Sequence, residues 1–210
     1  MSRAFAEIAF TPSVLAVQEK QGSAEGYASF LDPETDRGDR IGPAESRLIS
    51  LRDGFYQATV TKDGWPYVQF RGGPRGFLKV LDEKTIAYAD FRGNRQYLSV
   101  GNLNDNDRIS LILMDYPNRR RLKVWGRVKM VGAKDDALLM SKLRNPDYRG
   151  LPERAVLISV EALDWNCPQH IPERLTYEEL EPHLAPVRNE IAQLRQENAE
   201  LKAKLEATSR

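Results

Sequence analysis

The sequence predicts a mainly β fold, a closed or Greek-key barrel with helices before and after it in the chain. Two observations lead to this fold class. Short strand patterns recur at regular spacing between residues 55 and 163, with turn residues between them, and this spacing is typical of antiparallel barrels. Strands do not alternate with long helices, which argues against a parallel sheet. A third observation, a heptad pattern over residues 184–205, predicts a separate helical tail.

The first part of the chain, residues 1–54, has the pattern of a helical segment that packs on the barrel. Pro12 stands at the start of an expected helix over residues 13–21, and Gly22 ends that helix. A second short helix is expected over residues 43–52, after a polar loop.

The barrel domain is expected over residues 55–175, and its strands pair mainly with their neighbours in the chain. Turn residues between the strand patterns predict hairpins. These hairpins join residues 55–61 with 65–70, 76–81 with 85–89, and 108–114 with 122–131, and a last strand covers residues 155–163. The apolar residues also recur with helical spacing in two stretches, residues 94–103 and 134–143.

The tail, residues 176–210, carries a seam of residues spaced alternately three and four apart. Its members are Leu184, Val187, Ile191, Leu194, Asn198, Leu201 and Leu205. A single Asn in such a seam commonly fixes the register and favours a two-stranded parallel pairing. We therefore expect a coiled coil through which the chain self-associates; the alternative is an amphipathic helix packed on its own barrel. Three heptads are marginal alone, so the pairing is expected to need a barrel dimer that brings the chains together.

Composition and charge exclude several classes of function. The chain is 41% hydrophobic and 29% charged, as soluble globular proteins are. Its net charge of +1 gives no general attraction to nucleic acid or membrane, and no apolar stretch approaches the ~20 residues of a membrane span. The single cysteine, Cys167, fits a reducing cytoplasm and is expected to be a packed thiol. His170 and His183 lack the spacing of metal ligands, so no metal is expected.

No self-contained catalytic arrangement is visible in the sequence, neither a nucleophile elbow nor a pair of redox cysteines. An enzyme of this kind takes its chemistry from a cofactor.

Three clusters of cationic residues remain as candidate ligand-binding sites. The members of the first cluster that we consider are Arg71, Gly72, Gly73 and Lys79. The glycines allow a planar ligand to approach the backbone, and the cations can meet a phosphate; the alternative is a bulged strand junction with surface charges.

The second cluster follows the strand of residues 85–89. Asn94 is a good N-cap residue, which would place Arg95 and Gln96 in the first turn of the helix that follows. Side chains of this kind beside a helix N-terminus form a phosphate cradle. The alternative is a solvated helix cap.

The third cluster lies on the strand of residues 122–131 and the turn before it. Strand alternation places Arg119, Arg121, Lys123 and Trp125 on one face. This row could serve a phosphate, a partner subunit or nucleic acid, and the alternative is a charged strand edge that resists aggregation. Nucleic-acid binding would need further basic surface and a positive charge balance, so it is not expected.

Read together, these segments resemble the pyridoxamine 5'-phosphate oxidase-like flavin-nucleotide-binding proteins, over about residues 10–175. The strings that carry the resemblance include Gly64–Gln69, Arg71–Pro74, Gly76–Val80, Asp90–Tyr97, Gly101–Leu103, Asp115–Pro117, Arg121–Gly126 and Asp164–Ile171. The resemblance implies a split Greek-key barrel and a homodimer, with FMN bound at the interface by both subunits. The coiled-coil tail lies outside it, and larger assemblies through residues 184–205 stay open.

The resemblance also assigns roles to individual residues. In the oxidases, an Arg and a Lys on one strand and an Arg-Lys pair at the start of a helix hold the FMN phosphate. Lys79 matches the strand Lys, Arg95 matches the Arg of the pair, and Gln96 replaces its Lys, which leaves one cation fewer. Arg71 or Arg75 would supply the strand Arg. A Gln that contacts the flavin ring in the oxidases falls near Arg121.

The sequence departs from the oxidases at its C-terminal end. They end in an Arg-rich motif that recognises the substrate phosphate, whereas residues 166–171 here form no such motif. Oxidation of vitamin B6 is therefore not expected. His170 is a candidate proton donor near the flavin or a simple turn residue.

The leading hypothesis is an FMN-dependent oxidoreductase that acts on an unidentified small molecule or electron donor. The alternative is a flavin carrier or sensor without turnover, whose coiled coil mediates oligomerisation. Haem or a deazaflavin on the same barrel is a third option, and the lack of an axial His on the barrel argues against haem.

Overall fold

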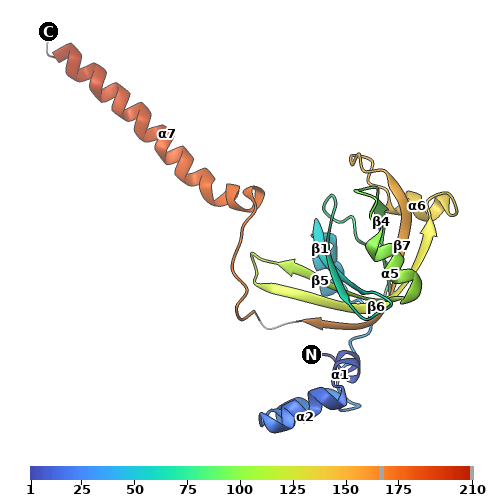
Figure 1. Ribbon diagram of the computed structural model, residues 1–210. Coiled ribbons are helices and arrows are strands. Elements are labelled where there is room, and N and C mark those ends of the chain that lie inside the picture. The colour runs from blue at the N-terminus through green and yellow to red at the C-terminus, as the bar shows by residue number, and fades with distance from the viewer. Residues whose placement is uncertain (166–167, 209–210) are drawn as a thin grey trace. The chain divides into compact units, whose positions relative to one another are not determined.

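The computed structural model describes residues 1–165 and 168–208 (Figure 1). Its contacts form two compact units, Met1–Ile171 and Pro172–Arg210. The first unit holds all seven strands and the helices α1 to α6. The second holds one helix, α7 (Tyr177–Thr208), in which no described side chain is buried.

The first unit is built on one antiparallel sheet in the order β2-β1-β5-β6-β7-β4-β3. The strands are β1 (Gly54–Val60), β2 (Pro66–Gly72), β3 (Lys79–Asp82), β4 (Thr85–Phe91), β5 (Arg108–Asp115), β6 (Arg120–Gly132) and β7 (Pro152–Trp165). The three hairpins expected from turn residues are confirmed as β1–β2, β3–β4 and β5–β6. The mainly β expectation is thus confirmed as a seven-stranded sheet with flanking helices.

The two longest strands, β6 and β7, join the two halves of the sheet. β7 pairs with β6 along almost its whole length, from Leu122 opposite Trp165 to Gly132 opposite Arg154. The first half of β7 also pairs with β4. The β6–β7 register shifts between Trp125 and Gly126. A Cβ at Gly126 would lie 2.4 Å from the Ser159 carbonyl oxygen, so the close approach of the two backbones requires glycine there.

The main core covers one face of the sheet, as the strand alternation requires. Phe55 from β1 stacks on Phe77 at 5.5 Å between ring centroids and meets Tyr88 edge-on at 5.3 Å. Leu111 and Leu122 extend this core onto β5 and β6 and are fully buried. A smaller cluster packs α6 (Ala137–Leu143) against β4 and β7.

The N-terminal segment contributes two helices that pack on the sheet, α1 and α4, and others whose side chains stay unburied. α4 (Pro43–Ser50) buries Leu48 and Ile49 in the main core. Phe5 of α1 (Arg3–Ala9) stacks on Trp125 at 4.3 Å. α2 (Pro12–Lys20) begins at the expected proline but buries none of its side chains, and the short α3 (Ala24–Ala28) with its 3-10 turn (Ser29–Leu31) is likewise unburied. α5 (Leu98–Asp105) buries Ser99 and Leu103; it contacts β1, and its Ser99 bonds to Gln69 of β2.

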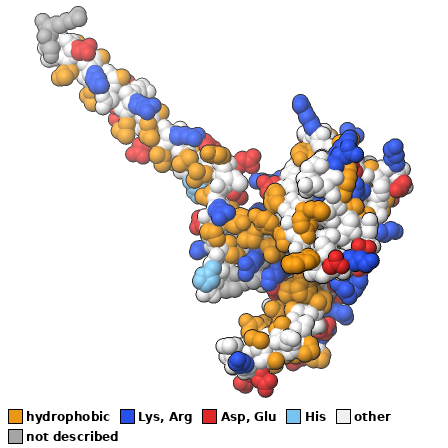
Figure 2. All heavy atoms as spheres, viewed as in Figure 1, with side chains coloured by type: hydrophobic (Ala, Val, Ile, Leu, Met, Phe, Trp, Pro, Cys, Tyr) orange, Lys and Arg blue, Asp and Glu red, His pale blue; other side chains and the backbone are white. Residues whose placement is uncertain are grey.

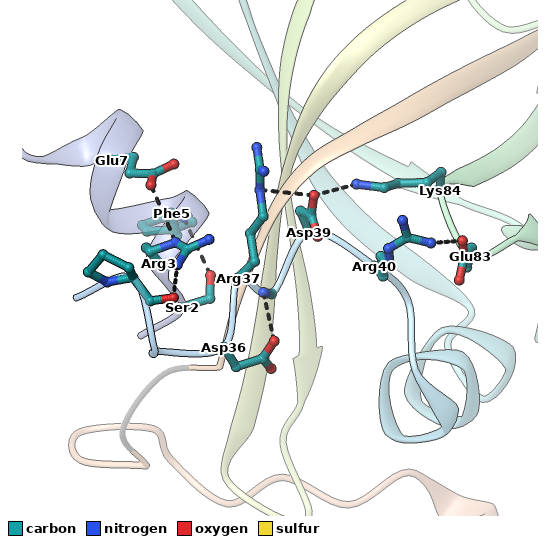
Figure 3. A network of polar contacts seen from close by, with 12 residues as sticks. Ser2, Arg3, Phe5, Glu7, Asp36, Arg37, Asp39, Arg40, Glu83 and Lys84 are labelled. Atoms are coloured by element: carbon teal, nitrogen blue, oxygen red, sulfur yellow. Dashed lines mark hydrogen bonds and ion pairs between the residues drawn. The ribbon is translucent and has the colours of Figure 1, made fainter. Parts of the chain in front are cut away.

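The strap of residues 36–41 ties α1 to the sheet (Figure 3). Its backbone accepts a hydrogen bond from the Ala4 N–H and another from Leu163 of β7. Asp39 lies between two cations, with its carboxylate 3.2 Å from Arg37 Nε and 2.6 Å from Lys84 Nζ. Burial raises the pKa of Asp39, but the hydrogen bond and charge of Lys84 and the charge of Arg37 outweigh it, so the pKa is lowered.

A buried carboxylate, Asp115 at the end of β5, organises the β5–β6 turn. It is 2% exposed. It accepts hydrogen bonds from Asn118 at 3.0 Å and Arg120 at 2.9 Å, and Arg52 Nη1 lies 3.5 Å away. Burial raises the pKa of Asp115, but these hydrogen bonds and the charges of both arginines outweigh it and lower the pKa.

None of the helices in the described residues combines the length and the apolar character that a membrane crossing needs.

The substitution Asp115→Asn should lower the free energy of unfolding at neutral pH by about 2 kcal/mol, because it removes hydrogen bonds from charged donors to a buried carboxylate. Since the folded-state pKa lies below its ordinary value of 3.8, this contribution is complete above that pH. It fades as the pH falls through the folded value. Urea denaturation of both proteins from pH 7 to pH 3 measures it. Asp63→Asn, at an exposed carboxylate in the β1–β2 turn, is the matched control; an equal loss in both variants would contradict the prediction.

Candidate functional site

The clearest polar cavity in the sheet unit lies between β2, β4 and the segment that precedes α5. Its volume is about 210 Å³. Among the residues that line it are Tyr67, Gln69, Arg71, Asp90, Asn94, Arg95, Gln96, Tyr97 and Glu153. It therefore contains four of the residues that the sequence predicts to bind the cofactor: Arg71, Asn94, Arg95 and Gln96.

Strand alternation in β2 supplies one wall of this pocket. Tyr67, Gln69 and Arg71 are half-buried and face the pocket, while Val68 and Phe70 between them are exposed on the opposite face. The Ser99 hydroxyl of α5 donates a hydrogen bond to Gln69 Oε1 at 3.0 Å. This bond holds the helix against the strand.

Asp90 from β4 is the buried charge of the pocket. It is 5% exposed. Arg71 Nη1 donates to its Oδ1 at 2.8 Å, and Arg154 Nε of β7 lies 3.7 Å from its Oδ2. Burial raises the pKa of Asp90, and the charges of Arg71 and Arg154 reduce that increase without cancelling it. The Nε of Arg71 is buried and has no hydrogen-bond partner among the described residues, so one donor is left unused.

The segment before α5 corrects one expectation. We expected Asn94 to cap a helix containing Arg95 and Gln96, and this is wrong, because α5 begins at Leu98. Asn94 Oδ1 instead accepts a hydrogen bond from the Gln96 N–H at 3.1 Å, a local turn that competes with helix formation. Arg95 and Tyr97 have φ of 63° and 54°, left-handed values that no α-helix contains.

Tyr97 and its neighbours hold this turn against β7. The Tyr97 hydroxyl donates to Glu153 Oε1 at 3.1 Å, and the Arg154 guanidinium lies 5.2 Å from the centre of the Tyr97 ring. Two left-handed residues other than glycine in one short segment cost free energy, and such strain is often found at binding sites. Their conformation places Arg95 at the pocket, where the described residues give its side chain no hydrogen bond or ion pair.

The pocket thus has the chemistry of an anion site. Arg71 has a spare buried donor although Asp90 pairs with it, and Arg95 carries a positive charge with no partner in the described part of the chain. Charge-assisted hydrogen bonds from arginine are well suited to phosphate and carboxylate groups. No group of three His, Cys, Asp or Glu side chains suited to a metal ion occurs in the ranges that the structure describes.

The other predicted site residues lie outside this pocket. Gly72 ends β2, and Gly73 follows it; a Cβ at Gly73 would come within 2.6 Å of the Phe77 ring, so tight packing accounts for that glycine. Lys79 of β3 shares a face with Leu81, which packs in the cluster around α6. His170 is exposed, with φ of 63°, in a turn where the Ile171 N–H bonds to the Pro168 carbonyl. Cys167 lies outside the described residues.

Arg121 and Lys123 lie on the outer face of β6, opposite the core. Leu122 and Val124 between them are fully buried, which confirms the alternation that the sequence predicts for this strand. Arg119 is not on this face, because it lies in the turn before the strand with φ of 49°. The Nε of Arg121 is buried without a hydrogen-bond partner among the described residues.

The same outer face carries unusually exposed apolar residues on β1, β2 and β5. Tyr56 is 42%, Phe70 58% and Val68 62% exposed. Tyr56 lies opposite Phe70 on one side and Ile112 on the other, and Ile112 lies opposite Lys123. Hydrophobic side chains gather over this half of the sheet in Figure 2. We call this surface, with Arg121 and Lys123 at its border, the outer face.

Sequence reasoning missed several pocket residues. Three of them, Tyr67, Gln69 and Tyr97, lie within the segments that carry the family resemblance. Whether the first two reach the pocket depends on which face of β2 is turned inward. Glu153 gave no signal, because it comes from a strand more than fifty residues further along the chain. The alternation in β2 is a local signal that could have placed Tyr67 and Gln69 on the same face as Arg71.

Comparisons with known proteins support a family assignment. A family model described as pyridoxamine 5'-phosphate oxidase matches residues 43–162, more than half of the chain. No curated protein sequence matches the chain.

Similar solved structures include three bacterial proteins. HupZ from Group A Streptococcus is 18% identical with a TM-score of 0.46, covering 64% of this chain and 100% of that one. An FMN-binding protein from Syntrophomonas wolfei is 13% identical with a TM-score of 0.46, covering 71% and 97%. General stress protein 26 from Bacillus anthracis is 14% identical with a TM-score of 0.44, covering 57% and 88%.

The left-handed backbone at Arg95 predicts an unusual order of stability for two substitutions. Arg95→Gly should be more stable than Arg95→Ala by about 1 kcal/mol, because glycine adopts this φ without the penalty of a Cβ. Chemical denaturation of the two variants measures the difference. At Arg144, which is exposed with φ of −68°, the same pair should show the opposite order. A more stable Ala variant at both positions would rule out the left-handed turn.

Proposed function

Because the chain belongs to the pyridoxamine 5'-phosphate oxidase family, we propose that it is an FMN-binding oxidoreductase. It works as a homodimer and holds the cofactor between the two subunits. The observation that carries the proposal is the pocket beside β2, where an unpaired arginine and a spare buried arginine donor converge.

The residues of the pocket fit the phosphate end of FMN. Arg95 and the free Nε of Arg71 donate to the phosphate, and the turn formed by Asn94 holds Arg95 in place. Gln96 contributes a neutral donor where the family resemblance leads us to expect a lysine, so the hold on the phosphate has one positive charge fewer.

The size of the pocket argues for a second subunit. Ligand pockets usually measure about 300–1,000 Å³, and this one measures about 210 Å³. One chain alone would therefore enclose only part of a cofactor as large as FMN, the part at its phosphate end. A second copy must cover the ring if water is to be kept away.

The outer face supplies a surface for that second copy. A two-fold dimer uses the same patch on both subunits, and the exposed Tyr56, Val68 and Phe70 form an apolar patch suited to such a contact. Arg121 lies at the border of the patch with an unused buried donor. In the dimer it reaches the flavin held by the other copy, as the family resemblance implies.

FMN, when bound, supplies the transfer of a hydride or electrons. The chain's own part is to bind and to orient. Arg71 and Arg95 fix the phosphate, while Arg121 from the second copy places a positive charge beside the ring. Such a charge favours the reduced, anionic form of a flavin. The substrate is an unidentified small molecule or electron donor; vitamin B6 is not proposed, because the Arg-rich C-terminal motif of the oxidases is missing from the sequence.

The visible absorption spectrum of the purified protein is the first test. The proposal predicts a yellow protein from which heating releases FMN. Turnover with NADH or NADPH then separates an enzyme from a carrier or sensor that only binds flavin. A colourless protein that does not bind added FMN would refute the cofactor assignment.

Arg95→Ala should weaken FMN binding roughly ten- to a hundredfold, because it removes a charge-assisted hydrogen bond to the phosphate. Fluorescence quenching during titration of the apoprotein with FMN measures the affinity. The same titration with riboflavin, which has no phosphate, should show little difference between the variant and the original protein. Arg144→Ala, at an exposed arginine outside the pocket, controls for the loss of surface charge. An equal loss for riboflavin would contradict the phosphate assignment.

Complementation between two variants tests the shared site. Arg95→Ala and Arg121→Ala homodimers should both bind FMN weakly. In a heterodimer of the two, one site has lost both arginines and the other keeps both, so about half of the sites should regain full affinity. Coexpression with two different tags yields the heterodimer, and its FMN content is the readout. A site contained within one chain would keep the weak affinity in every combination.

A further inference from the structure

Helix α7 carries an apolar stripe that nothing else within its own unit, residues 172–208 as described, covers. All its described side chains are unburied, and Leu201, at 64% exposed, is typical of the stripe. Figure 2 shows hydrophobic side chains following one another along this helix. The helix is 32 residues long, about 48 Å at 1.5 Å per residue. An isolated helix of mixed composition in water needs such a stripe to be buried.

The order of residue types along the stripe is that of a heptad repeat. Ile191, Asn198 and Leu205 take the position conventionally called a, and Leu194 and Leu201 take position d. Ile191 is the one β-branched residue at a, so the preference for two parallel strands rests mainly on the Asn at a, which fixes the register because each Asn finds its own counterpart. Within the described residues, the side chain of Asn198 forms no hydrogen bond, so its amide is available to the Asn198 of a second helix.

The charges beside the stripe select the orientation. The e positions are all cationic, namely Arg188, Arg195 and Lys202, while Glu190 and Glu197 take the g positions before the last two of these. In a parallel pair, a g residue faces the e residue five places later on the other helix. Glu190 then faces Arg195, and Glu197 faces Lys202, on both sides of the pair. Lys204, the last g residue, would face position 209, which lies outside the described residues.

An antiparallel pair brings together g with g and e with e. Glu190 would face Glu197, and Arg188 would face Arg195, so the flanking contacts formed by these four residues would repel. Asn198 would also face an apolar residue and leave its amide without a partner. The same sequence therefore favours one orientation and opposes the other.

From this pattern we infer that α7 pairs with α7 of a second copy as a parallel, in-register, two-stranded coiled coil. The seam runs over residues 184–205. Pro186 lies inside α7 near the start of this seam and has no N–H to donate within the helix. The charge pattern and Asn198 together restrict the partner to an identical helix.

This inference adds to the proposed function but does not depend on it, because every observation behind it lies in α7. A seam of this length is marginal alone, so a contact between two sheet units would strengthen it by raising the effective concentration of the helices. A parallel pair in turn places the same two chains side by side, as a cofactor site shared by two subunits requires.

Disulfide trapping in the full-length chain tests the orientation. Cys167→Ser removes the one native cysteine, and Leu201→Cys then places a thiol at position d. Parallel, in-register helices bring the two copies of residue 201 together, so oxidation should convert most of the protein into a covalent dimer. Ala203→Cys, on the opposite side of the helix, is the matched control and should give little covalent dimer.

The alternatives have distinct outcomes in the same assay. An antiparallel pair would join the cysteine at 201 to one placed at 184 or 191 on a differently tagged chain, and would give little dimer between two copies of 201. A helix packed on its own sheet unit would give no covalent dimer. Either result would overturn the inference. The FMN content of the purified chain is an independent readout, so covalent dimers without FMN would refute the cofactor proposal alone.

Charge reversal tests the role of the flanking residues. Glu190→Lys with Glu197→Lys makes these g and e positions cationic and should lower the effective concentration of the two thiols at 201 by roughly tenfold. Adding Arg195→Glu and Lys202→Glu restores opposite charges across a parallel pair and should recover most of the loss. The thiol–disulfide equilibrium in a glutathione buffer measures both. A fourfold variant no better than the twofold one would contradict the parallel pairing.

Discussion

The pairing of β6 with β7 is the constraint on which the rest of the sheet unit depends. Among the described residues, these two strands alone join the halves of the sheet. β5 pairs with β6 and is followed outward by β1 and β2, while β4 pairs with β7 and is followed by β3. The bulge at Gly126 lets them bend where the two halves meet. Its glycine is required because the Ser159 carbonyl leaves no room for a side chain.

This pair of strands also explains why the candidate site has two separate parts. β7 carries Glu153 and Arg154 toward the pocket, where they hold Tyr97 and Asp90, while β6 carries Arg121 and Lys123 on the outer face. Because side chains alternate along a strand, Arg121 cannot turn toward the core face without moving Leu122 and Val124 out of it. The two sets of arginines therefore face opposite sides of the sheet, which is why the proposed cofactor site draws its second set from another copy of the chain.

The charged side chains of the pocket have different roles, which follow from how deeply each is buried. Asp90 is the most buried of them, and burial raises its pKa even though Arg71 and Arg154 lie beside it. Its carboxylate keeps the two arginines in place, and it also reduces the positive charge that they present. Arg95 is outside this arrangement, so in the proposed site it contributes the charge that an incoming phosphate meets first. The strained turn at Arg95 and Tyr97 is then the part of the site that binding would stabilise.

Local sequence patterns predicted the hairpins and the faces of the strands well, because turn residues and alternation are properties of neighbouring residues. The pairing of β1 with β5 and of β4 with β7 was beyond them, since it joins segments far apart in the chain. The pocket shows the same limit. Arg71 and Arg95 were found from local clusters of cationic residues and the family resemblance. Asp90 as a buried counter-ion and Glu153 as the partner of Tyr97 depend on that long-range pairing. The helix expected from Asn94 failed for a local reason, because an Asn side chain can satisfy a turn as readily as it caps a helix.

In the pairing that we infer, the sequence of the tail itself encodes the partner, and in this the tail differs from the sheet unit. A heptad specifies which residues face a second helix, and the g and e charges specify the direction of that helix. The outer face carries no comparable code, since apolar residues such as Val68 and Phe70 accept many partners. Two weak contacts that join the same two chains strengthen each other, because formation of one makes the other intramolecular. A specific helix pair can thus select the copy with which a less specific apolar face associates.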